Sequence, residues 1–316
     1  MSVYCALAPA KVNLGLFLGP PRAHDSRHEL VTVMQSISLA DELRLAPAPL
    51  GTEEDELLCP HVPGPPDENL AARALSAFRA ATGWDAPAQR LTIRKRIPLA
   101  AGLGGGSADA AAALRLARHA SGLGDEQLLR ELGSDLGADV PAQVSPGRWL
   151  ATGGGERLHA LPNPSRPVGL LVVPLAARLS TADVYAEADL LGLGRTQREL
   201  DELRSRLRIG LELGAPVPAA DELLHNDLQA AAISLCPEIA AVLREVDAAG
   251  AEEALVSGSG PTVVGLFHRA NAWGRVERAA TELRGRAPEP IAALSVDSAF
   301  ARPVEAEDPH PDGGSA

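Results

Sequence analysis

The stretch that decides the fold reads PLAAGLGGGS and runs from Pro98 to Ser107. Residues 90–97 before it alternate apolar and polar as a strand does, and residues 108–120 after it are rich in the helix formers Ala and Leu. A single glycine would suffice for a tight turn, but four stand within positions 102–106. Glycines permit close backbone approach, and the free amides at a helix N-terminus favour an anion. The order of strand, glycine loop and helix therefore predicts a phosphate-binding loop.

The residues that follow the loop exclude three common glycine motifs. A P-loop requires Lys and then Ser or Thr after its last glycine, whereas Gly106 is followed by Ser107 and Ala108. A dinucleotide-binding fingerprint requires glycine where Ser107 stands. A nucleophile elbow requires glycine where Asp109 stands. The loop must therefore belong to another class of phosphate binder.

Strand and helix patterns occur on both sides of the loop. Further strands are expected at 12–18, 29–38, 168–173, 253–256, 262–267 and 291–296, and loops at 19–27 and 47–66. Further helices are expected at 68–81, 126–136, 182–191, 197–207, 223–235, 238–248 and 271–283. This mixture predicts an α+β protein with two lobes, 1–160 and 161–302, separated near Pro162, Pro164 and Pro167. The Pro-, Gly- and acid-rich residues 303–316 are expected to form a disordered tail.

Composition narrows the class of protein. The 316 residues carry a formal net charge of -12, which argues against nucleic acid as a partner. Three widely spaced cysteines give neither a disulfide framework nor a zinc site and suit a reducing compartment. Because no apolar run approaches the ~20 residues that span a bilayer, and the N-terminus lacks a basic start, we expect a cytoplasmic protein without a membrane partner.

Three more segments carry groups suited to catalysis. Residues 9–14 read PAKVNL, residues 137–141 read GADVP, and residues 257–261 read SGSGP between two expected strands. Taken alone, Lys11 would be an exposed lysine at the start of a strand, and Asp139 would be a capping or turn residue.

In this order, the four segments resemble the motifs of the GHMP kinases, and residues 68–70 (ENL) and 226–228 (NDL) agree with them. The similarity covers residues 5–300, nearly the whole chain. It implies a two-lobed fold, with an N-terminal lobe like a ribosomal-protein domain, a C-terminal ferredoxin-like lobe and the active site between them. It also implies an enzyme that transfers phosphate from ATP, with Mg²⁺, to a hydroxyl group of a small molecule.

The resemblance also assigns roles to single residues. Asp139 would accept or orient the hydroxyl proton, and Lys11 would lower the pKa of the hydroxyl and stabilise the developing charge. The ATP-binding residues implied are Asn69, Lys95, Pro98, Gly102, Gly104, Gly105, Gly106 and Ser107, and Ser107 is also a candidate contact for Mg²⁺. The substrate-binding residues implied are Asn13, Arg27, His28, Asp139 and Tyr185, and the implied substrate is a cytidine diphosphate sugar alcohol.

One departure leaves the substrate open. The family usually carries Asp-Gly-Tyr-His after the first strand, whereas residues 24–28 read HDSRH, so Arg27 replaces the tyrosine that would stack on cytosine. An arginine plane can also stack on a base, but Arg27 could equally be a solvated loop charge. Two alternatives follow: a divergent kinase for another sugar, polyol or amino alcohol, and a catalytically silent regulator with the same fold. Intact Lys11 and Asp139 argue against the silent regulator.

Overall fold

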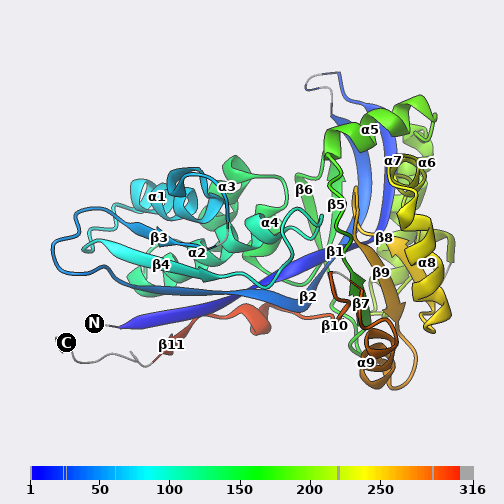
Figure 1. Cartoon of the computed structure of the whole chain (residues 1–316). Helices are drawn as coiled ribbons and strands as arrows, with labels where there is room; N and C mark the ends of the chain where they lie inside the picture. Colours follow the sequence, from blue (N-terminus) through cyan, green and yellow to red (C-terminus); the bar gives the residue numbers. More distant parts are fainter. Residues whose placement is uncertain are drawn as a thin grey trace.

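The computed structural model describes residues 2–306, except 24, 26, 61, 219, 220 and 287. It has two lobes, and two long antiparallel strands run through both of them (Figure 1). These strands are β1 (Val3–Pro21) and β2 (His28–Pro47). They pair with each other along most of their length, with register shifts near Pro9, Asn13 and Leu18.

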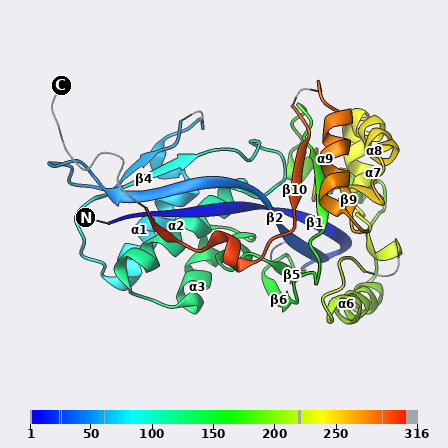
Figure 2. The same ribbon diagram turned by 90° about the horizontal axis from the view of Figure 1, so that it is seen from below.

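In the first sheet, β2 pairs with different strands along its length. One half of β2 pairs with β5 (Arg148–Gly153), and the other half pairs with β4 (Gln89–Arg94). Strands β3 (Glu56–Leu58), β6 (Arg157–Leu161) and β11 (Val304–Ala306) extend the sheet beside β4, β5 and β1. The helices of this lobe lie together on one side of β4 and β2 (Figure 2). They are η1 (Pro66–Glu68), α1 (Leu70–Thr82), α2 (Gly105–Ser121), α3 (Glu126–Leu136) and α4 (Val140–Val144). The alanine-rich α2 is buried along most of its length between α1 and the sheet, because small side chains permit close packing.

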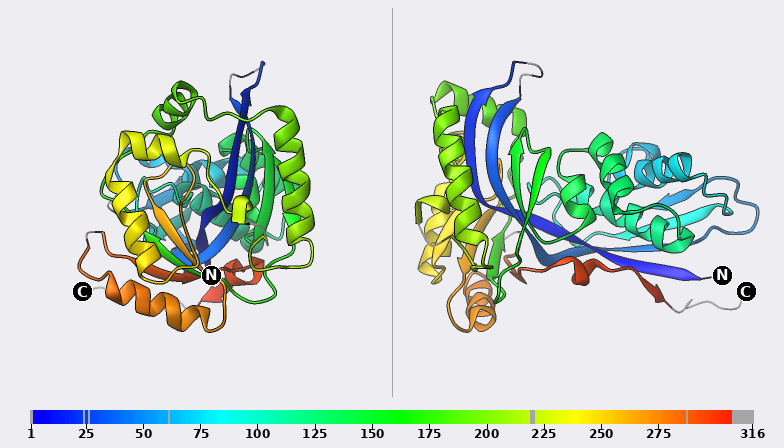
Figure 3. Two further views of the ribbon diagram at one scale, coloured as in Figure 1. Left: turned by 90° about the vertical axis from the view of Figure 1, so that its right-hand side faces the viewer. Right: turned by 180° about the vertical axis from the view of Figure 1, so that it is seen from behind.

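The second sheet is antiparallel, in the order β10 (Ile291–Leu294), β7 (Gly169–Val173), β9 (Val263–Phe267) and β8 (Glu253–Val256). Leu171, Val173 and Phe267 point to a helical layer. The helices of this lobe are α5 (Thr181–Leu190), α6 (Gln197–Leu211), η2 (Asp221–Leu223), α7 (Gln229–Leu235), α8 (Glu238–Ala248) and α9 (Ala272–Glu282) (Figure 3). The short helix η3 (Ser298–Ala301) contacts β1 on the way back to the first lobe.

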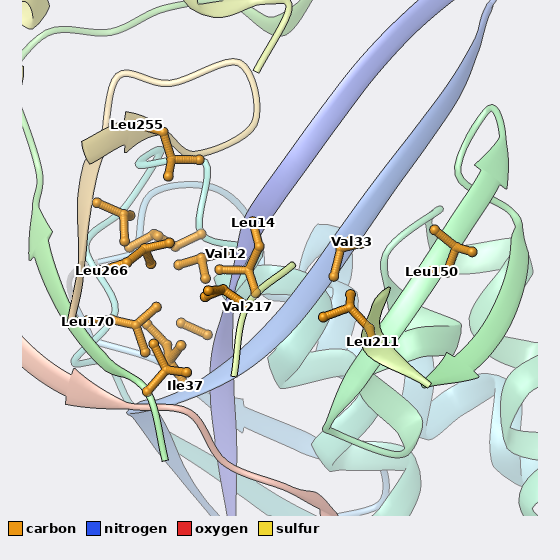
Figure 4. Close-up of a cluster of buried hydrophobic side chains, with 14 of the residues drawn as sticks. Val12, Leu14, Val33, Ile37, Leu150, Leu170, Leu211, Val217, Leu255 and Leu266 are labelled. Carbon is orange, nitrogen blue, oxygen red and sulfur yellow. The ribbon is translucent and has the colours of Figure 1, made fainter. Parts of the chain in front are cut away.

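The opposite face of the second sheet packs on the two long strands. Leu170, Leu255 and Leu266 meet Val12 and Ile37 in one buried cluster (Figure 4). This shared core fixes the two lobes against each other at the middle of β1. Because the loops on either side of that point come from different lobes, a site between the lobes is held by rigid elements.

Several expectations need correction. Strands β1 and β2 extend far beyond 12–18 and 29–38, and β3 lies within an expected loop. Strands β5 and β6 and the short α4 were not predicted. The helix expected at 223–235 begins at Gln229, because the Asn226 and Asp227 side chains bind backbone amides instead.

The expected tail also starts too early. Strand β11 pairs with β1 in antiparallel register, with Val3 opposite Ala306. Residues 303–306 are therefore ordered, and residues 307–316 lie outside the described chain. The division into lobes at 160 and 161 stays a prediction; the second sheet begins at Gly169.

Candidate active site

The glycine loop has the form of an anion cradle. Gly104 is the N-cap of α2 with φ 69°, a left-handed conformation that favours glycine. Ala108 N donates to Gly104 O at 2.9 Å, which closes the first turn. No side chain of the described chain caps the helix, so the amides of residues 105–107 stay available for an anion at its positive end.

Lys11 lies directly against this loop. Its amide donates to Leu103 O at 2.9 Å, and a Cβ added to Gly104 would lie 3.0 Å from its Cγ. Its ammonium donates to Asn13 Oδ1 at 2.9 Å and lies 3.4 Å from Asp139 Oδ2. The lysine side chain is only 12% exposed, so it is not a solvated lysine at a strand start.

Asp139 is not used as a helix cap. It precedes α4 in a helical conformation, and its side chain makes no capping hydrogen bond. The side chain is 35% exposed, so its carboxylate is accessible to a ligand while it remains beside the Lys11 ammonium. This pairing is the geometry expected of a cation and a base that act on one hydroxyl group.

A buried network holds Asn13 and thereby Lys11. Asn13 Nδ2 donates to Thr32 Oγ1 at 2.8 Å, and Thr32 in turn donates to Gly15 O at 2.6 Å. Asn13 N donates to Ser257 Oγ at 3.3 Å, across the boundary between the lobes. Since the side-chain nitrogen Nδ2 of Asn13 donates to Thr32, the side-chain oxygen Oδ1 is left to accept from Lys11.

The turn at residues 257–261 closes over the glycine loop. Asn226 Nδ2 donates to Val256 O at 2.8 Å and to Gly258 O at 2.7 Å, and so fixes the start of the turn. Thr262 Oγ1 donates to Ala101 O at 2.7 Å, and a Cβ on Gly102 would lie 2.8 Å from Gly260 O. The two glycine-rich segments therefore touch.

Two cavities adjoin at the loop. The larger, of about 350 Å³, is lined from both lobes and contains Lys11, Asn13, Asp139 and Tyr185. The smaller, of about 250 Å³, lies along residues 95–107 and includes Leu70, Lys95 and Pro98. Gly102, Gly104 and Ser107 line both cavities. This arrangement suits a phosphate donor on one side of the loop and an acceptor on the other.

Of the residues expected to bind the cytosine base, His28 and Tyr185 lie together and Arg27 does not join them. The rings of His28 and Tyr185 lie 5.4 Å apart, and His28 Nε2 donates to Asp189 Oδ1 at 2.8 Å. Burial, with the nearby Asp139 charge, raises the pKa of Tyr185 to about 12, so its hydroxyl stays neutral at physiological pH. Arg27, in contrast, is 65% exposed beside Asp25 and lines neither cavity.

Two residues that were expected to contact the nucleotide, Asn69 and Lys95, form hydrogen bonds within the protein. Asn69 Oδ1 accepts from Ala71 N at 2.9 Å and is the N-cap of α1, and Asn69 lines neither cavity. Lys95 borders the smaller cavity, but its ammonium is held by two carboxylates. Neither arrangement was visible in the sequence.

Sequence reasoning missed several residues of the larger cavity. Thr32 lies on β2, Thr181 begins α5, and Gly154 and Gly155 form the turn between β5 and β6. The second glycine run at 153–155 was the one available signal. A threonine within a strand gives none, because threonine is common there for reasons of packing.

The chain is similar to known kinases in sequence. The models of the GHMP kinases N-terminal and C-terminal domains match residues 69–147 and 212–283. The 4-diphosphocytidyl-2-C-methyl-D-erythritol kinase of Anaeromyxobacter dehalogenans is 40% identical over 296 residues, which are 92% of this chain and 88% of that one. The enzyme of the same name from Salinispora arenicola is 43% identical over 293 residues, covering 87% and 86% of the two chains.

Solved structures agree as well. A crystal structure of 4-(cytidine 5'-diphospho)-2C-methyl-D-erythritol kinase matches with a TM-score of 0.74 and 34% identity over 92% of this chain and 99% of that one. Homoserine kinase from Cytophaga hutchinsonii shares the fold, with a TM-score of 0.68 at 15% identity over 96% and 97% of the two chains. The chain belongs to the GHMP kinase family.

Proposed function

We propose that this protein transfers phosphate from ATP to the 2-hydroxyl of 4-diphosphocytidyl-2-C-methyl-D-erythritol, a step of non-mevalonate isoprenoid precursor biosynthesis. The observation that carries the proposal is the Lys11–Asp139 pair, 3.4 Å apart in a cavity that adjoins the glycine loop. Relatives about 40% identical over 92% of this chain bear the name of that kinase. No helix of the described residues is long and apolar enough to cross a membrane.

The catalytic roles follow from position and charge. In phosphoryl transfer, positioning and electrostatic stabilisation supply most of the catalysis. Asp139 accepts or orients the proton of the acceptor hydroxyl, since its carboxylate is accessible and not engaged as a cap. Lys11 lowers the pKa of that hydroxyl and stabilises the charge that develops on it. The amides of residues 105–107 hold the ATP phosphates.

The donor set fits a magnesium ion carried by ATP. Mg²⁺ usually keeps several waters and takes one or two protein oxygens together with substrate phosphates. The Ser107 hydroxyl and the Asp139 carboxylate line the same cavity, and the described residues contain no cluster of three or more metal-ligating side chains. Ser107 would hold the ion, which neutralises phosphate charge when it is bound.

The base of the substrate would lie against Tyr185, with His28 at its polar edge. Arg27 lies beside Asp25 with its side chain 65% exposed, and it would have to change its side-chain rotamer to cover the other face. That exposure is also what supports the second candidate, a related kinase for another sugar, polyol or amino alcohol. In that case Arg27 contributes nothing to binding.

Steady-state kinetics separates these functions. The substrates are ATP with the cytidyl compound, with the same sugar phosphate lacking the nucleotide, and with other alcohols. We expect turnover of the cytidyl compound and a loss of about 10²–10⁴ in kcat for Asp139→Asn. Binding of a non-hydrolysable ATP analogue to Asp139→Asn should persist. Turnover of another alcohol alone would assign the second candidate, and wild-type turnover by the variant would remove Asp139 from the mechanism.

A further inference from the structure

Two buried carboxylates and a partly buried lysine meet beneath the glycine loop, and the proposed chemistry uses none of their charges. Lys95 Nζ donates to Asp41 Oδ2 at 2.5 Å and to Asp109 Oδ2 at 2.6 Å. The side chains of the lysine and the two aspartates are 13%, 0% and 4% exposed. Burying charges costs desolvation free energy even where they are paired, so their retention beside a binding loop calls for a role.

The cluster ties the loop to the sheet. Asp41 lies on β2, and its Oδ1 accepts from the amides of Arg96 at 2.5 Å and Ile97 at 2.8 Å. Asp109 lies on α2, at the start of its second turn. A Cβ on Gly105 would lie 3.4 Å from Lys95 Nζ, so the ammonium sits directly under the first residue of the helix.

We propose that Asp109 is a positioning residue for the nucleotide: together with Asp41 it holds the Lys95 ammonium beneath Gly105 and so fixes the first turn of the phosphate-binding loop. The inference rests on the proposed function, because it assumes that ATP phosphates bind at this turn. Lys95 then acts as a strut between β2 and α2. Its ammonium does not pair with the phosphates.

Geometry distinguishes Asp109 from Asp41. Both oxygens of Asp41 have partners, whereas Oδ1 of Asp109 is buried and has no hydrogen-bond partner among the described residues. One ammonium faces two carboxylates, which gives the fully ionised cluster a net charge of minus one. A proton on Asp109 makes the cluster neutral.

The surroundings favour that proton. Burial and the neighbouring Asp41 raise the pKa of Asp109 to about 7, against the opposing effect of Lys95. The partly buried Cys59 thiol also faces the cluster, and burial followed by the Asp109 charge raises its pKa.

Isothermal titration of Asp109→Asn with a non-hydrolysable ATP analogue tests the proposal. We expect affinity to fall about tenfold, equivalent to about 1.4 kcal/mol, while kcat at saturating ATP changes little. In a Lys95→Met background, Asp109→Asn should add less than a twofold change, because Asp109 acts through the lysine.

The matched control is Asp55→Asn. Asp55 forms a bidentate pair with Arg79 in the same lobe and lines neither cavity at the loop, so its loss should lower stability without changing ATP affinity. Unchanged affinity in Asp109→Asn would overturn the proposal. Tighter binding would overturn it too, since release of Lys95 toward the phosphates would then be favourable. If the wild type binds no nucleotide, the proposed function fails first and this inference fails with it.

Discussion

A single methyl group at Gly104 should separate the catalytic geometry of the loop from its stability. Gly104 is the N-cap of α2 with φ 69°, and a Cβ there would lie 3.0 Å from Lys11 Cγ and 3.3 Å from its Cε. Gly122 caps the other end of the same helix with φ 70°, and a Cβ there meets nothing within 4 Å. Alanine at either position therefore has the same backbone strain, and only Gly104→Ala reaches Lys11, the proposed catalytic lysine.

The magnitudes follow from these contacts. A left-handed alanine costs about 1–2 kcal/mol, so both variants should lose about that much free energy of unfolding. A contact of 3.0 Å obliges Lys11 to move by a few tenths of an ångström, which disturbs its distances of 2.9 Å to Asn13 and 3.4 Å to Asp139. Because a misplacement of about 1 Å can cost about 10² in rate, we expect kcat to fall about tenfold in Gly104→Ala.

Urea unfolding and steady-state kinetics at saturating ATP provide the two measurements. Gly122→Ala should keep the wild-type kcat despite its loss of stability. Equal kcat in the two variants would refute the reasoning, because it would show that the close approach of Gly104 and Lys11 has no catalytic consequence. A much larger loss of stability in Gly104→Ala than in Gly122→Ala would instead show that the close contact with Lys11 disturbs the folding of the loop.

Three further predictions test other parts of the molecule. Tyr185→Ala should raise KM for the cytidyl substrate about 5- to 150-fold, since base stacking is worth about 1–3 kcal/mol, and it should change KM for ATP less; equal effects on both would remove Tyr185 from base binding. Burial raises the pKa of Asp109 from its usual 3.8 to about 7, so between these pH values the folded state keeps a proton that the unfolded chain has lost. The unfolding free energy of wild type relative to Asp109→Asn should therefore fall as pH rises from about 4 to about 7. A difference that does not change with pH would contradict the raised pKa. Truncation after Arg302 removes β11 and its pairing with β1, which should cost about 1–2 kcal/mol in urea unfolding, whereas truncation after Ala306 should have no effect; equal stability would show that β11 contributes nothing.

The sequence predicted the elements whose signal is local. Four glycines before an alanine-rich helix indicated the anion cradle, and the order of the four motifs indicated the family and its two lobes. The ends of the long strands were missed, because the early part of β1 carries Ala6, Ala8 and Ala10, and alanine has little intrinsic preference for strands. That part is a strand because it pairs with β2, a long-range interaction that periodicity cannot reveal.

Individual residues of the site could be named from the sequence, but the contacts between them could not. Lys11 and Asp139 could be named, but their distance of 3.4 Å depends on chain segments 128 positions apart, as their numbering shows. The two carboxylates around Lys95 come from β2 and α2, so the engagement of its ammonium could not be inferred from its own surroundings in the sequence. Arg27 was placed by its match to a motif, and the structure leaves its side chain exposed.

The relation between the lobes also positions the proposed catalytic pair. Lys11 is oriented by Asn13, whose backbone amide donates to Ser257 in the turn of the second lobe. That turn is held by Asn226, which donates to Val256 O and Gly258 O. A rotation of one lobe against the other would therefore first disturb the hydrogen bond from the Asn13 backbone to Ser257. It would then move the Asn13 side chain that orients Lys11. Because the shared core beneath the site packs residues of the second sheet directly on β1 and β2, such a rotation would also open a buried apolar interface, which opposes it. The same packing that joins the lobes thus keeps the ammonium of Lys11 beside Asp139.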